Sequence, residues 1–304
     1  MSVPDLYDVV IVGGGPAGLS AALLLGRCCR RVLVCDAGNP RNIRSRASHG
    51  FLTRDGTPPL EILRLGREQL VCYGVELRDG TAMAVTPENG IFRVKLLDES
   101  EVCCRKVLLA TGVVDRVPDV EGFREHYGIS IHHCPYCDGW EHKGEPLAAY
   151  GKGKSGTALA LALKTWTRDV VLCTDGTSKL LDAERSKLKE KEIEVYEGKF
   201  LRVEGTLGKM ERIVFTDSSD LKRSALFFST GNVQRSRLPC ELGCELTNKG
   251  AVRMLKEQRT STAGVWIAGD AAHDSQYVVV AAAHGARAGM AINKELQSEE
   301  GLVY

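Results

Sequence analysis

Two cysteines near the middle of the chain are spaced for redox chemistry. Cys134 and Cys137 lie in the stretch HHCPYCDGWEHKG, and Asp138 follows directly. A CxxC pair can close a disulfide of small ring size, and this spacing favours the reactive thiolate form. The same spacing is also half of a four-ligand zinc site, and many cysteines serve only in packing. The rest of the chain has to separate these three interpretations.

A zinc site would need two further ligands at a comparable spacing. The nearest candidates are His132, His133 and His142, which are crowded into the same loop. The sequence has no second CxxC, because three residues separate Cys240 from Cys244. The pattern therefore favours a redox pair, and we expect no metal site.

Charge and composition narrow the function classes. The 304 residues carry a formal net charge of +1, so bulk electrostatics favours neither nucleic acid nor an anionic membrane. No apolar stretch approaches the length of about 18 residues that marks a membrane span, and the N-terminus does not have the pattern of a signal peptide. We therefore expect a cytoplasmic protein that binds no nucleic acid and no membrane. The cysteines outside the CxxC pair are expected to be buried packing residues.

A glycine-rich loop near the N-terminus has the setting of a dinucleotide-binding motif. The apolar run YDVVIV, residues 7–12, predicts a buried parallel strand, and GGGPAG and an apolar helix follow. In this motif Gly13 permits the tight turn, Gly15 lets a pyrophosphate approach the backbone, and Gly18 lets the helix pack on the strand. Asp36 ends the next predicted strand, where an acid can bind the ribose hydroxyls.

A second loop of this kind follows the CxxC. The stretch EPLAAYGKGKSGTALALALKTW predicts a strand, a turn with three glycines and a helix, and the next strand ends near Asp175. Lys154, beside the middle glycine, could neutralise a pyrophosphate. Two such loops indicate two nucleotide ligands with hydride or electron transfer between them. Alternatively, the second fold binds nothing.

The order of the motifs identifies a family. GGGPAG, the ATG at residues 110–112, CPYCDG and GVWIAGDAA occur in this order along the chain. In these motifs the chain resembles the low-molecular-weight thioredoxin reductases. The resemblance implies an α/β fold with two Rossmann-like dinucleotide-binding domains of three-layer ββα type. It further implies a discontinuous FAD-binding domain, residues 1–115 and 232–304, an inserted domain, residues 116–231, that carries the CxxC, and a homodimer.

The same resemblance implies the cofactor-binding residues. For FAD they are Gly13, Gly15, Pro16, Ala17, Gly18, Asp36, Ala37, Asn42, His49, Ala82, Ala110, Thr111, Gly112, Gly269, Asp270, Gln276 and Tyr277. For the second dinucleotide, the second glycine loop and the strand after it give Gly151, Gly153, Lys154, Gly156 and Asp175 as candidates.

The resemblance also gives roles to the residues of the CxxC loop. Cys137 would lie against the flavin, and Cys134 would be the outward thiol that attacks a partner disulfide. Asp138 would exchange a proton with the sulfur atoms, or it would serve as the N-cap of an incoming helix. The neighbouring His132 and His133 would tune the thiolate or be bystanders.

The chain departs from the family where NADPH would bind. NADPH-dependent members carry a histidine and two arginines after the second strand of the inserted domain, and these clamp the 2′-phosphate. Here residues 173–176 read CTDG, and the next arginine is Arg185. Asp175 would repel a 2′-phosphate and suits a 2′-hydroxyl. The sequence therefore argues against classical NADPH use. NADH, a second FAD, or no nicotinamide with ferredoxin as the electron donor stay open.

The CxxC loop is atypical as well, because Pro135 and Tyr136 are bulkier than the residues most common between the cysteines. A similar motif occurs in relatives that oxidise small-molecule dithiols with oxygen as the acceptor. At the C-terminus, Tyr304 either stacks on a flavin, as aromatic tails do in some ferredoxin-linked relatives, or belongs to a frayed end.

The predicted function is that of an FAD-dependent thiol–disulfide oxidoreductase of thioredoxin-reductase type. Electrons would pass through FAD and Cys134–Cys137 to a thioredoxin-like protein or to another disulfide. One alternative is a dithiol oxidase that acts on a small molecule. A second alternative, from another class, is a flavin-binding module for electron transfer or redox sensing.

Four further stretches carry structural predictions. Residues 195–217 predict a three-stranded layer in the inserted domain, and residues 76–94 predict a matching layer in the FAD domain. Residues 182–196 predict a charged surface helix that leads into a strand, and residues 235–244 predict a loop.

Overall fold

The computed structural model describes residues 6–272 and 275–302. Tyr304 lies outside these residues, so its predicted contact with a flavin stays a prediction. The chain divides into two compact units. Unit 1 comprises Met1–Ile43, Gly50–Val114 and Val233–Tyr304, and unit 2 comprises Arg44–His49 and Asp115–Asn232. The mixed α/β organisation confirms the predicted fold class.

A seven-stranded sheet forms the centre of unit 1. Its strands follow the order β3-β2-β1-β6-β5-β4, and β17 pairs with the second half of β6. The bounds are β1 (Leu6–Val12), β2 (Val32–Asp36), β3 (Glu76–Asp79), β4 (Ala82–Glu88), β5 (Ile91–Leu96), β6 (Glu101–Leu109) and β17 (Val265–Ile267). The separate layer predicted for residues 76–94 is partly wrong, because β3 joins the parallel sheet beside β2. Only β4 and β5 extend it as antiparallel strands.

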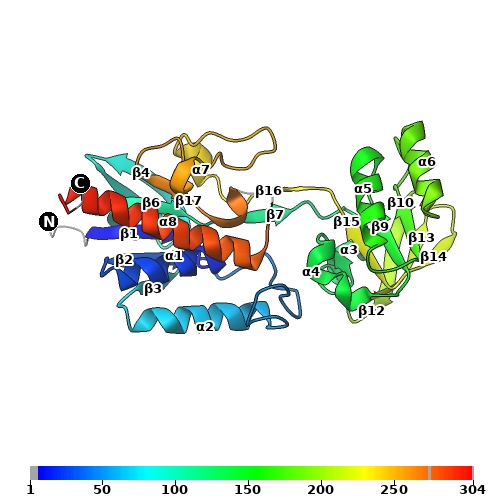
Figure 1. Cartoon of the computed structure of the whole chain (residues 1–304), viewed down its shortest axis with the longest axis horizontal. Coiled ribbons are helices and arrows are strands. Elements are labelled where there is room, and N and C mark those ends of the chain that lie inside the picture. Colours follow the sequence, from blue (N-terminus) through cyan, green and yellow to red (C-terminus); the bar gives the residue numbers. More distant parts are fainter. Residues whose placement is uncertain (1–5, 273–274, 303–304) are drawn as a thin grey trace. The chain divides into compact units, whose positions relative to one another are not determined.

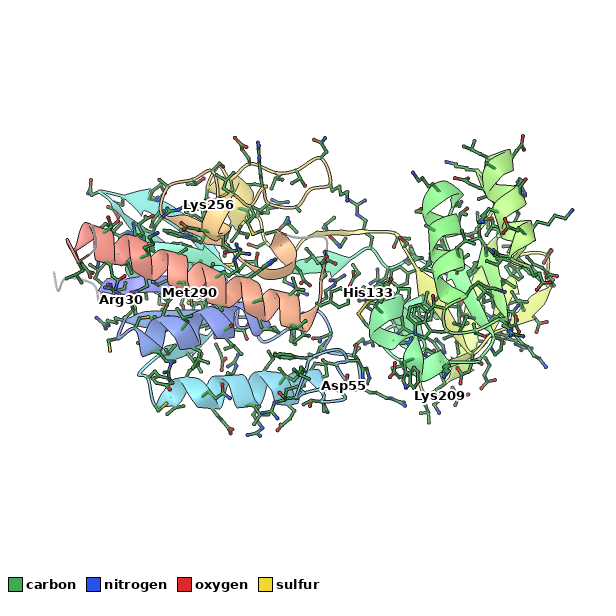
Figure 2. The ribbon with its side chains drawn as sticks, viewed as in Figure 1. Arg30, Asp55, His133, Lys209, Lys256 and Met290 are labelled. Atoms are coloured by element: carbon green, nitrogen blue, oxygen red, sulfur yellow. A yellow bond between two sulfur atoms is a disulfide. The ribbon has the colours of Figure 1, made fainter. Side chains whose placement is uncertain are left out.

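Three long helices belong to unit 1, namely α1 (Pro16–Arg27), α2 (Pro59–Val71) and α8 (Val278–Glu299). Helices α1 and α8 lie side by side (Figure 1). Small residues permit this close approach, because a Cβ added at Gly285 would lie 1.9 Å from the backbone oxygen of Ala17. Arg30, just after α1 (Figure 2), binds Asn293 in α8 and Glu300 directly after it. The bonds from Arg30 and Arg105 lower the pKa of Glu300 to about 2.

Short elements complete unit 1 and the connections to unit 2. They are α7 (Leu238–Glu241), η2 (Lys256–Gln258), η3 (Gly269–Ala271) and the paired strands β7 (Val113–Asp115) and β16 (Asn232–Gln234). The prediction of a loop over residues 235–244 is therefore wrong at its centre, where Pro239 occupies the first turn of α7. Among the described residues, no helix has the length and hydropathy needed to cross a membrane.

Unit 2 contains two sheets. The parallel sheet has the order β11-β10-β9-β15-β8, and a three-stranded antiparallel sheet has the order β12-β13-β14. The strands are β8 (Ile131–His132), β9 (Leu147–Tyr150), β10 (Val170–Cys173), β11 (Glu194–Tyr196), β12 (Phe200–Thr206), β13 (Lys209–Phe215), β14 (Asp220–Lys222) and β15 (Ala225–Phe228). The predicted three-stranded layer is confirmed, but its strands extend from Phe200 to Lys222, and residues 195–196 belong to β11 of the parallel sheet.

The helices of unit 2 are α3 (Phe123–His126), α4 (Pro135–Asp138), η1 (Trp140–His142), α5 (Gly153–Leu163) and α6 (Asp182–Glu190). The predicted charged helix is confirmed as α6, which leads into β11. The core of this unit is aromatic. The Phe123 ring lies edge-on to Tyr150 and Phe228, with centroids 5.4 and 6.0 Å away.

The cysteines outside the CxxC pair divide into two groups. Cys35, Cys103, Cys104, Cys173 and Cys244 are buried, as predicted. Burial raises the pKa of Cys35 to about 11 and that of Cys104 to about 12, so both stay protonated and unreactive. The packing prediction is wrong for Cys28, Cys29, Cys72 and Cys240, which are exposed.

Candidate active site

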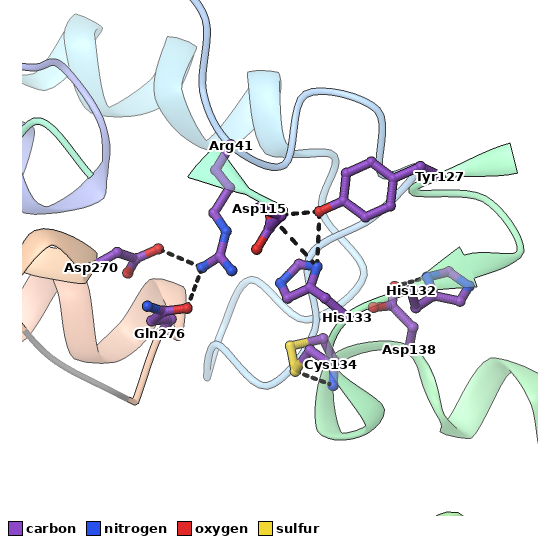
Figure 3. The surroundings of a disulfide bond; sticks show 10 residues. Arg41, Asp115, Tyr127, His132, His133, Cys134, Asp138, Asp270 and Gln276 are labelled. Atoms are coloured by element: carbon purple, nitrogen blue, oxygen red, sulfur yellow. Dashed lines mark hydrogen bonds and ion pairs between the residues drawn. A yellow bond between two sulfur atoms is a disulfide. The ribbon is translucent and has the colours of Figure 1, made fainter. Parts of the chain in front are cut away.

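The CxxC forms a disulfide at the start of α4. Sγ of Cys134 is bonded to Sγ of Cys137, and the two Cα atoms are 5.3 Å apart. The backbone N–H of Cys137 also donates to Sγ of Cys134 over 3.2 Å (Figure 3). This N–H would stabilise negative charge on that sulfur when the bond is reduced. Because the sulfurs are bonded to each other, they are not thiolate ligands of a zinc ion.

Local packing explains the residues around the disulfide. Pro135 begins α4, where its missing N–H costs no hydrogen bond. A Cβ at Gly139 would lie 2.4 Å from the backbone oxygen of Pro135 and 2.8 Å from the Trp166 ring, so only glycine fits. Asp138 is the last residue of α4, and the N-cap of η1 is Gly139. The N-cap alternative for Asp138 is therefore wrong.

A chain of polar side chains leads away from Asp138. Its Oδ1 lies 3.4 Å from Nδ1 of His132, and Nε2 of His132 lies 3.1 Å from Nε2 of His142. Nδ1 of His142 lies 2.8 Å from a carboxylate oxygen of Glu145. From the sequence, His142 was predicted only as a candidate zinc ligand, and Glu145 was not predicted to take part. The spacing of three residues between His142 and Glu145 in a polar loop was the available signal.

A second polar group surrounds His133, which directly precedes Cys134. The hydroxyl of Tyr127 donates to Oδ2 of Asp115 over 2.6 Å and lies 3.0 Å from Nδ1 of His133 (Figure 3). The Asp115 side chain is 5% exposed, so these bonds are made within the protein. Tyr127 and Asp115 hold the His133 ring in one orientation beside the disulfide.

Aromatic side chains surround the disulfide at the surface of unit 2. Tyr136, between the cysteines, is 75% exposed, and Trp140 is 68% exposed. Tyr136 contacts the edge of Trp166, with ring centroids 5.7 Å apart. The Lys143 ammonium lies 4.6 Å from the centre of the Trp140 ring. Large exposed aromatic groups of this kind are typical of binding surfaces.

The first glycine loop, in unit 1, has the geometry that its sequence predicts. Gly13 has φ of +110°, and a Cβ there would lie 2.3 Å from the backbone oxygen of Ala110. A Cβ at Gly18 would lie 1.9 Å from the backbone oxygen of Gly13. At Gly15, by contrast, a Cβ would meet no atom within 4 Å. Gly13 and Gly18 therefore serve packing within the protein, whereas Gly15 leaves space above the N-terminus of α1.

Further predicted FAD residues lie on loops at the ends of the parallel strands. Pro16 and Ala17 open α1, Asp36 ends β2 with Ala37 next, Ala110 to Gly112 follow β6, and Gly269 and Asp270 follow β17. Arg41, which was not among the predicted cofactor residues, donates to Asp270 over 3.0 Å and to Gln276 over 2.7 Å (Figure 3).

Some predicted FAD residues have other surroundings. Asp36 forms an ion pair of 2.5 Å with Arg67 of α2. The Ala82 side chain packs in the core, so only its backbone could reach a ligand. His49 belongs to unit 2, where its Nε2 lies 3.3 Å from Glu141. Asn42 lies in the loop after β2, and Tyr277 is the N-cap of α8.

The second glycine loop, in unit 2, is partly covered by its own chain. The N–H of Gly153, at the start of α5, donates to the backbone oxygen of Ser178 over 2.8 Å. The backbone oxygen of Lys179 would lie 3.3 Å from a Cβ at Gly153. Gly151 and Gly156 pack against each other, and Lys154 is exposed. Carbonyl oxygens therefore occupy part of the place where a pyrophosphate would meet amide donors.

Asp175 is bound within unit 2. Its Oδ2 accepts from the Tyr150 hydroxyl over 2.9 Å, and its Oδ1 accepts from the N–H of Phe200 over 2.9 Å. Burial, followed by the hydrogen bond and charge of Asp175, raises the pKa of Tyr150 above its ordinary value. The hydroxyl therefore stays protonated throughout the neutral range.

We expect Asp175→Ala to lower the free energy of unfolding by about 2 kcal/mol, because a partly buried hydroxyl and an amide lose their acceptor. Tyr150→Phe breaks one of the two bonds and should cost about half as much. Urea unfolding of the three proteins measures both effects. If Asp175→Ala kept full stability and instead weakened nucleotide binding, Asp175 would bind the ribose.

Comparisons with known proteins identify the family to which the chain belongs. A model of the pyridine nucleotide-disulphide oxidoreductase family matches residues 7–286. The chain belongs to this family. A relative from Arthroderma benhamiae, described as a probable thioredoxin reductase, is 30% identical over 96% of this chain and 81% of its own length.

Two crystal structures extend this result to the fold of the family. A protein from Bacillus anthracis, described as "putative thioredoxin reductase TrxB", has 31% identity and a TM-score of 0.92 over 97% of this chain and 99% of its own. The structure of HlmI has 36% identity and a TM-score of 0.93 over 97% and 93%. The chain is therefore a thioredoxin reductase-like, FAD-dependent disulfide oxidoreductase with two Rossmann-like folds.

Unit 1 fits the FAD that the family implies. The space above Gly15 and the uncapped N-terminus of α1 suit a pyrophosphate. The buried Oγ1 of Thr111, in the ATG motif, has no hydrogen-bond partner among the described residues, so a ligand could supply one. When bound, FAD would supply the two-electron redox centre of the enzyme. The family also implies a nicotinamide nucleotide. In unit 2, however, the N–H of Gly153 already donates to the backbone oxygen of Ser178.

Proposed function

We propose that this enzyme exchanges electrons with a thioredoxin-like protein through the Cys134–Cys137 disulfide. The observation that carries the proposal is the bonded CxxC, followed by Asp138, among exposed aromatic side chains. The surface made by Tyr136 and Trp140 suits a protein that must bring its own disulfide to Cys134. The relative from Arthroderma benhamiae supports this choice by its description as a thioredoxin reductase.

The proposed exchange needs two sulfur atoms and one acid. The Cys134 thiolate attacks the partner disulfide, a mixed disulfide forms, and one partner sulfur leaves as a thiolate. Cys137 then attacks Cys134, so the Cys134–Cys137 bond forms again and the second partner sulfur leaves. Asp138 protonates a leaving thiolate. The partner gains two electrons, which the reduced cysteine pair loses.

The partner protein can be tested directly. In Cys137→Ser, Cys134 can still attack the disulfide of oxidised thioredoxin, but no second thiol can release the partner sulfur. The variant should therefore trap a mixed disulfide between Cys134 and thioredoxin. Non-reducing electrophoresis and mass spectrometry would detect the adduct at Cys134. If Cys137→Ser forms no adduct with any thioredoxin and instead forms one with small disulfides, the partner class is wrong.

For the electron donor, we propose that NADPH bound in the usual way is not the source. The sequence CTDG at residues 173–176 offers no basic group to a 2′-phosphate, and Asp175 is held by Tyr150 and Phe200. NADH, ferredoxin and a second FAD in unit 2 stay as candidates. The FAD-binding role of unit 1 and a homodimer also stay proposals from the family resemblance, and a cytoplasmic location stays a proposal from the composition and the N-terminal sequence.

We expect NADPH at micromolar concentration to bleach the flavin absorbance slowly or not at all, because unit 2 has no clamp for the 2′-phosphate. Anaerobic stopped-flow spectroscopy measures this rate. Dithiothreitol under the same conditions is the control, since it should reduce the enzyme through Cys134–Cys137. Fast bleaching by NADPH would show that the basic cluster is dispensable.

A second candidate function is the oxidation of a dithiol with oxygen as the acceptor. The backbone oxygens of Ser178 and Lys179 lie beside Gly153, where a nicotinamide nucleotide would bind. An enzyme that takes its electrons from a dithiol does not need this nucleotide, so the arrangement favours the second function. Oxygen consumption during steady dithiol turnover, with stoichiometric disulfide formation, would support this function. A flavin that exchanges electrons without turnover would instead point to an electron-transfer or sensing module.

A further inference from the structure

We propose that Asp138, His132, His142 and Glu145 form a proton relay between the CxxC and solvent. The proposal rests on the proposed function, because it supplies the proton that disulfide exchange requires. All four residues lie in unit 2. Asp138 ends α4 and His132 ends β8, whereas His142 ends η1 and Glu145 lies in the loop that follows.

The relay leads from Asp138, whose side chain is 20% exposed, to the more exposed Glu145. Its three gaps are 3.4 Å from Asp138 to His132, 3.1 Å from His132 to His142, and 2.8 Å from His142 to Glu145. The side chains of His132 and His142 are 5% and 13% exposed, whereas that of Glu145 is 45% exposed. Solvent therefore has its most open access at Glu145.

Neighbouring groups hold the imidazole rings of His132 and His142 in place. Both rings pack on Phe227 of β15, with centroid distances of 5.2 Å for His132 and 6.2 Å for His142. The N–H of Glu145 donates to the backbone oxygen of His142 over 3.1 Å, which fixes the turn between them. The rings are thus held against an apolar wall, where water does not compete for their nitrogen atoms.

The atoms that face each other determine how protons are shared. Two Nε2 atoms meet, so one imidazole must donate and the other must accept. If Nδ1–H of His142 donates to Glu145, then Nε2–H of His132 donates to His142, and Nδ1 of His132 accepts from a protonated Asp138. If Glu145 carries the proton, all three bonds run the other way, and Nδ1–H of His132 donates to an ionised Asp138.

These two arrangements differ by one proton. When each of three protons moves across one of the three contacts, one net proton passes from Glu145 to Asp138, and every nitrogen keeps a neighbour. No electron moves and no other atom changes place. A uniform direction of hydrogen bonds in each state is what a relay requires.

Disulfide exchange needs one such proton. A partner disulfide becomes two thiols with two electrons from the cysteine pair and one proton from the Cys137 thiol. The attacking Cys134 is a thiolate, so the second proton must come from solvent. Asp138 directly follows Cys137 and lies four residues after Cys134 at the end of the same short helix. The Asp138 side chain is 20% exposed, and a dithiol or a protein joined to Cys134 covers it further, so the relay supplies its proton through Glu145.

Other charged groups nearby are engaged elsewhere. Glu141 lies 3.3 Å from His49, Lys143 covers the Trp140 ring, and Asp115 is bound by Tyr127. His133 belongs to this last group. Glu141 therefore provides a matched control, since it is an exposed glutamate of η1, four residues before Glu145, that lies outside the relay.

The test compares Glu145→Gln with Glu141→Gln in the holoenzyme. Glutamine at 145 can still accept from His142, so the geometry stays, but it cannot carry a proton. Dithiothreitol reduces the Cys134–Cys137 disulfide, and acid quenching followed by alkylation and mass spectrometry gives the rate. We expect Glu145→Gln to slow this reaction about tenfold, to remove the curvature of its rate in mixtures of H₂O and D₂O, and to be rescued by added imidazole. Glu145→Asp should restore part of the rate.

The relay is wrong if Glu145→Gln and Glu141→Gln match the native enzyme in rate and isotope effect. A purely structural role for Glu145 would lower the rate without any change in the isotope effect and without rescue by imidazole. Failure of the proposed function is recognised separately, because the enzyme would then turn over without Cys134. His142→Gln, a more buried change, should reproduce the effect of Glu145→Gln if it folds.

Discussion

Cys134→Ser is expected to lower turnover with a disulfide or dithiol partner by at least about a thousandfold, while FAD stays bound. Serine lacks a sulfur that can form a disulfide, so neither the mixed disulfide nor the Cys134–Cys137 bond can arise. The flavin should be unaffected, because the proposed FAD residues of the glycine loop lie in unit 1, whereas Cys134 lies in unit 2. Steady-state kinetics and the ratio of flavin absorbance to protein measure the two effects.

Cys240→Ser is the matched control for this variant. Cys240 is an exposed free cysteine that lies in unit 1, and we expect its replacement to leave turnover unchanged. A Cys134→Ser enzyme that has lost its yellow colour would contradict the site assignment. Normal turnover with the flavin retained would show that the CxxC is not the redox pair.

A methyl group at Gly18 should have the largest effect on folding. The Cβ of Gly18→Ala would lie 1.9 Å from the backbone oxygen of Gly13, so α1 must shift away from β1. We expect unfolding free energy to fall by about 3 kcal/mol and FAD binding to be lost with it. Urea unfolding of the flavin-free protein and the flavin content after purification give the two quantities.

Gly15→Ala separates cofactor binding from folding. At Gly15 a Cβ would meet no atom of the protein, and the backbone φ of −75° suits alanine. This variant should therefore keep its stability without flavin and bind FAD at least about tenfold more weakly, because the methyl group occupies the space meant for the pyrophosphate. Unchanged FAD affinity in Gly15→Ala would place the pyrophosphate elsewhere.

Much of the fold could be predicted from local sequence. The run YDVVIV followed by GGGPAG specifies strand, turn and helix within a short stretch, because burial and backbone conformation are local demands there. The same holds for the three-stranded layer and for α6. The prediction failed at α7, which is too short for a periodic pattern, and at β3, whose place in a sheet depends on distant strands.

The site was predictable only in part. Cys134, Cys137 and Asp138 could be recognised because they are consecutive in a motif. Interactions between distant stretches could not be recognised, as in the bond from Tyr127 to Asp115 or the cover of Gly153 by Ser178. Asp175 shows the limit most clearly. Its position fits a ribose-binding acid, yet both of its carboxylate oxygens bind groups within unit 2.

The central claim is that FAD and the Cys134–Cys137 disulfide form one redox system. An anaerobic reductive titration with dithionite, read by flavin absorbance, tests it most directly. We predict that the native enzyme takes up about four electrons per chain, two for FAD and two for the disulfide, whereas Cys134→Ser takes up about two. An uptake of about two electrons in both proteins would contradict the claim, because the disulfide would then be isolated from the flavin.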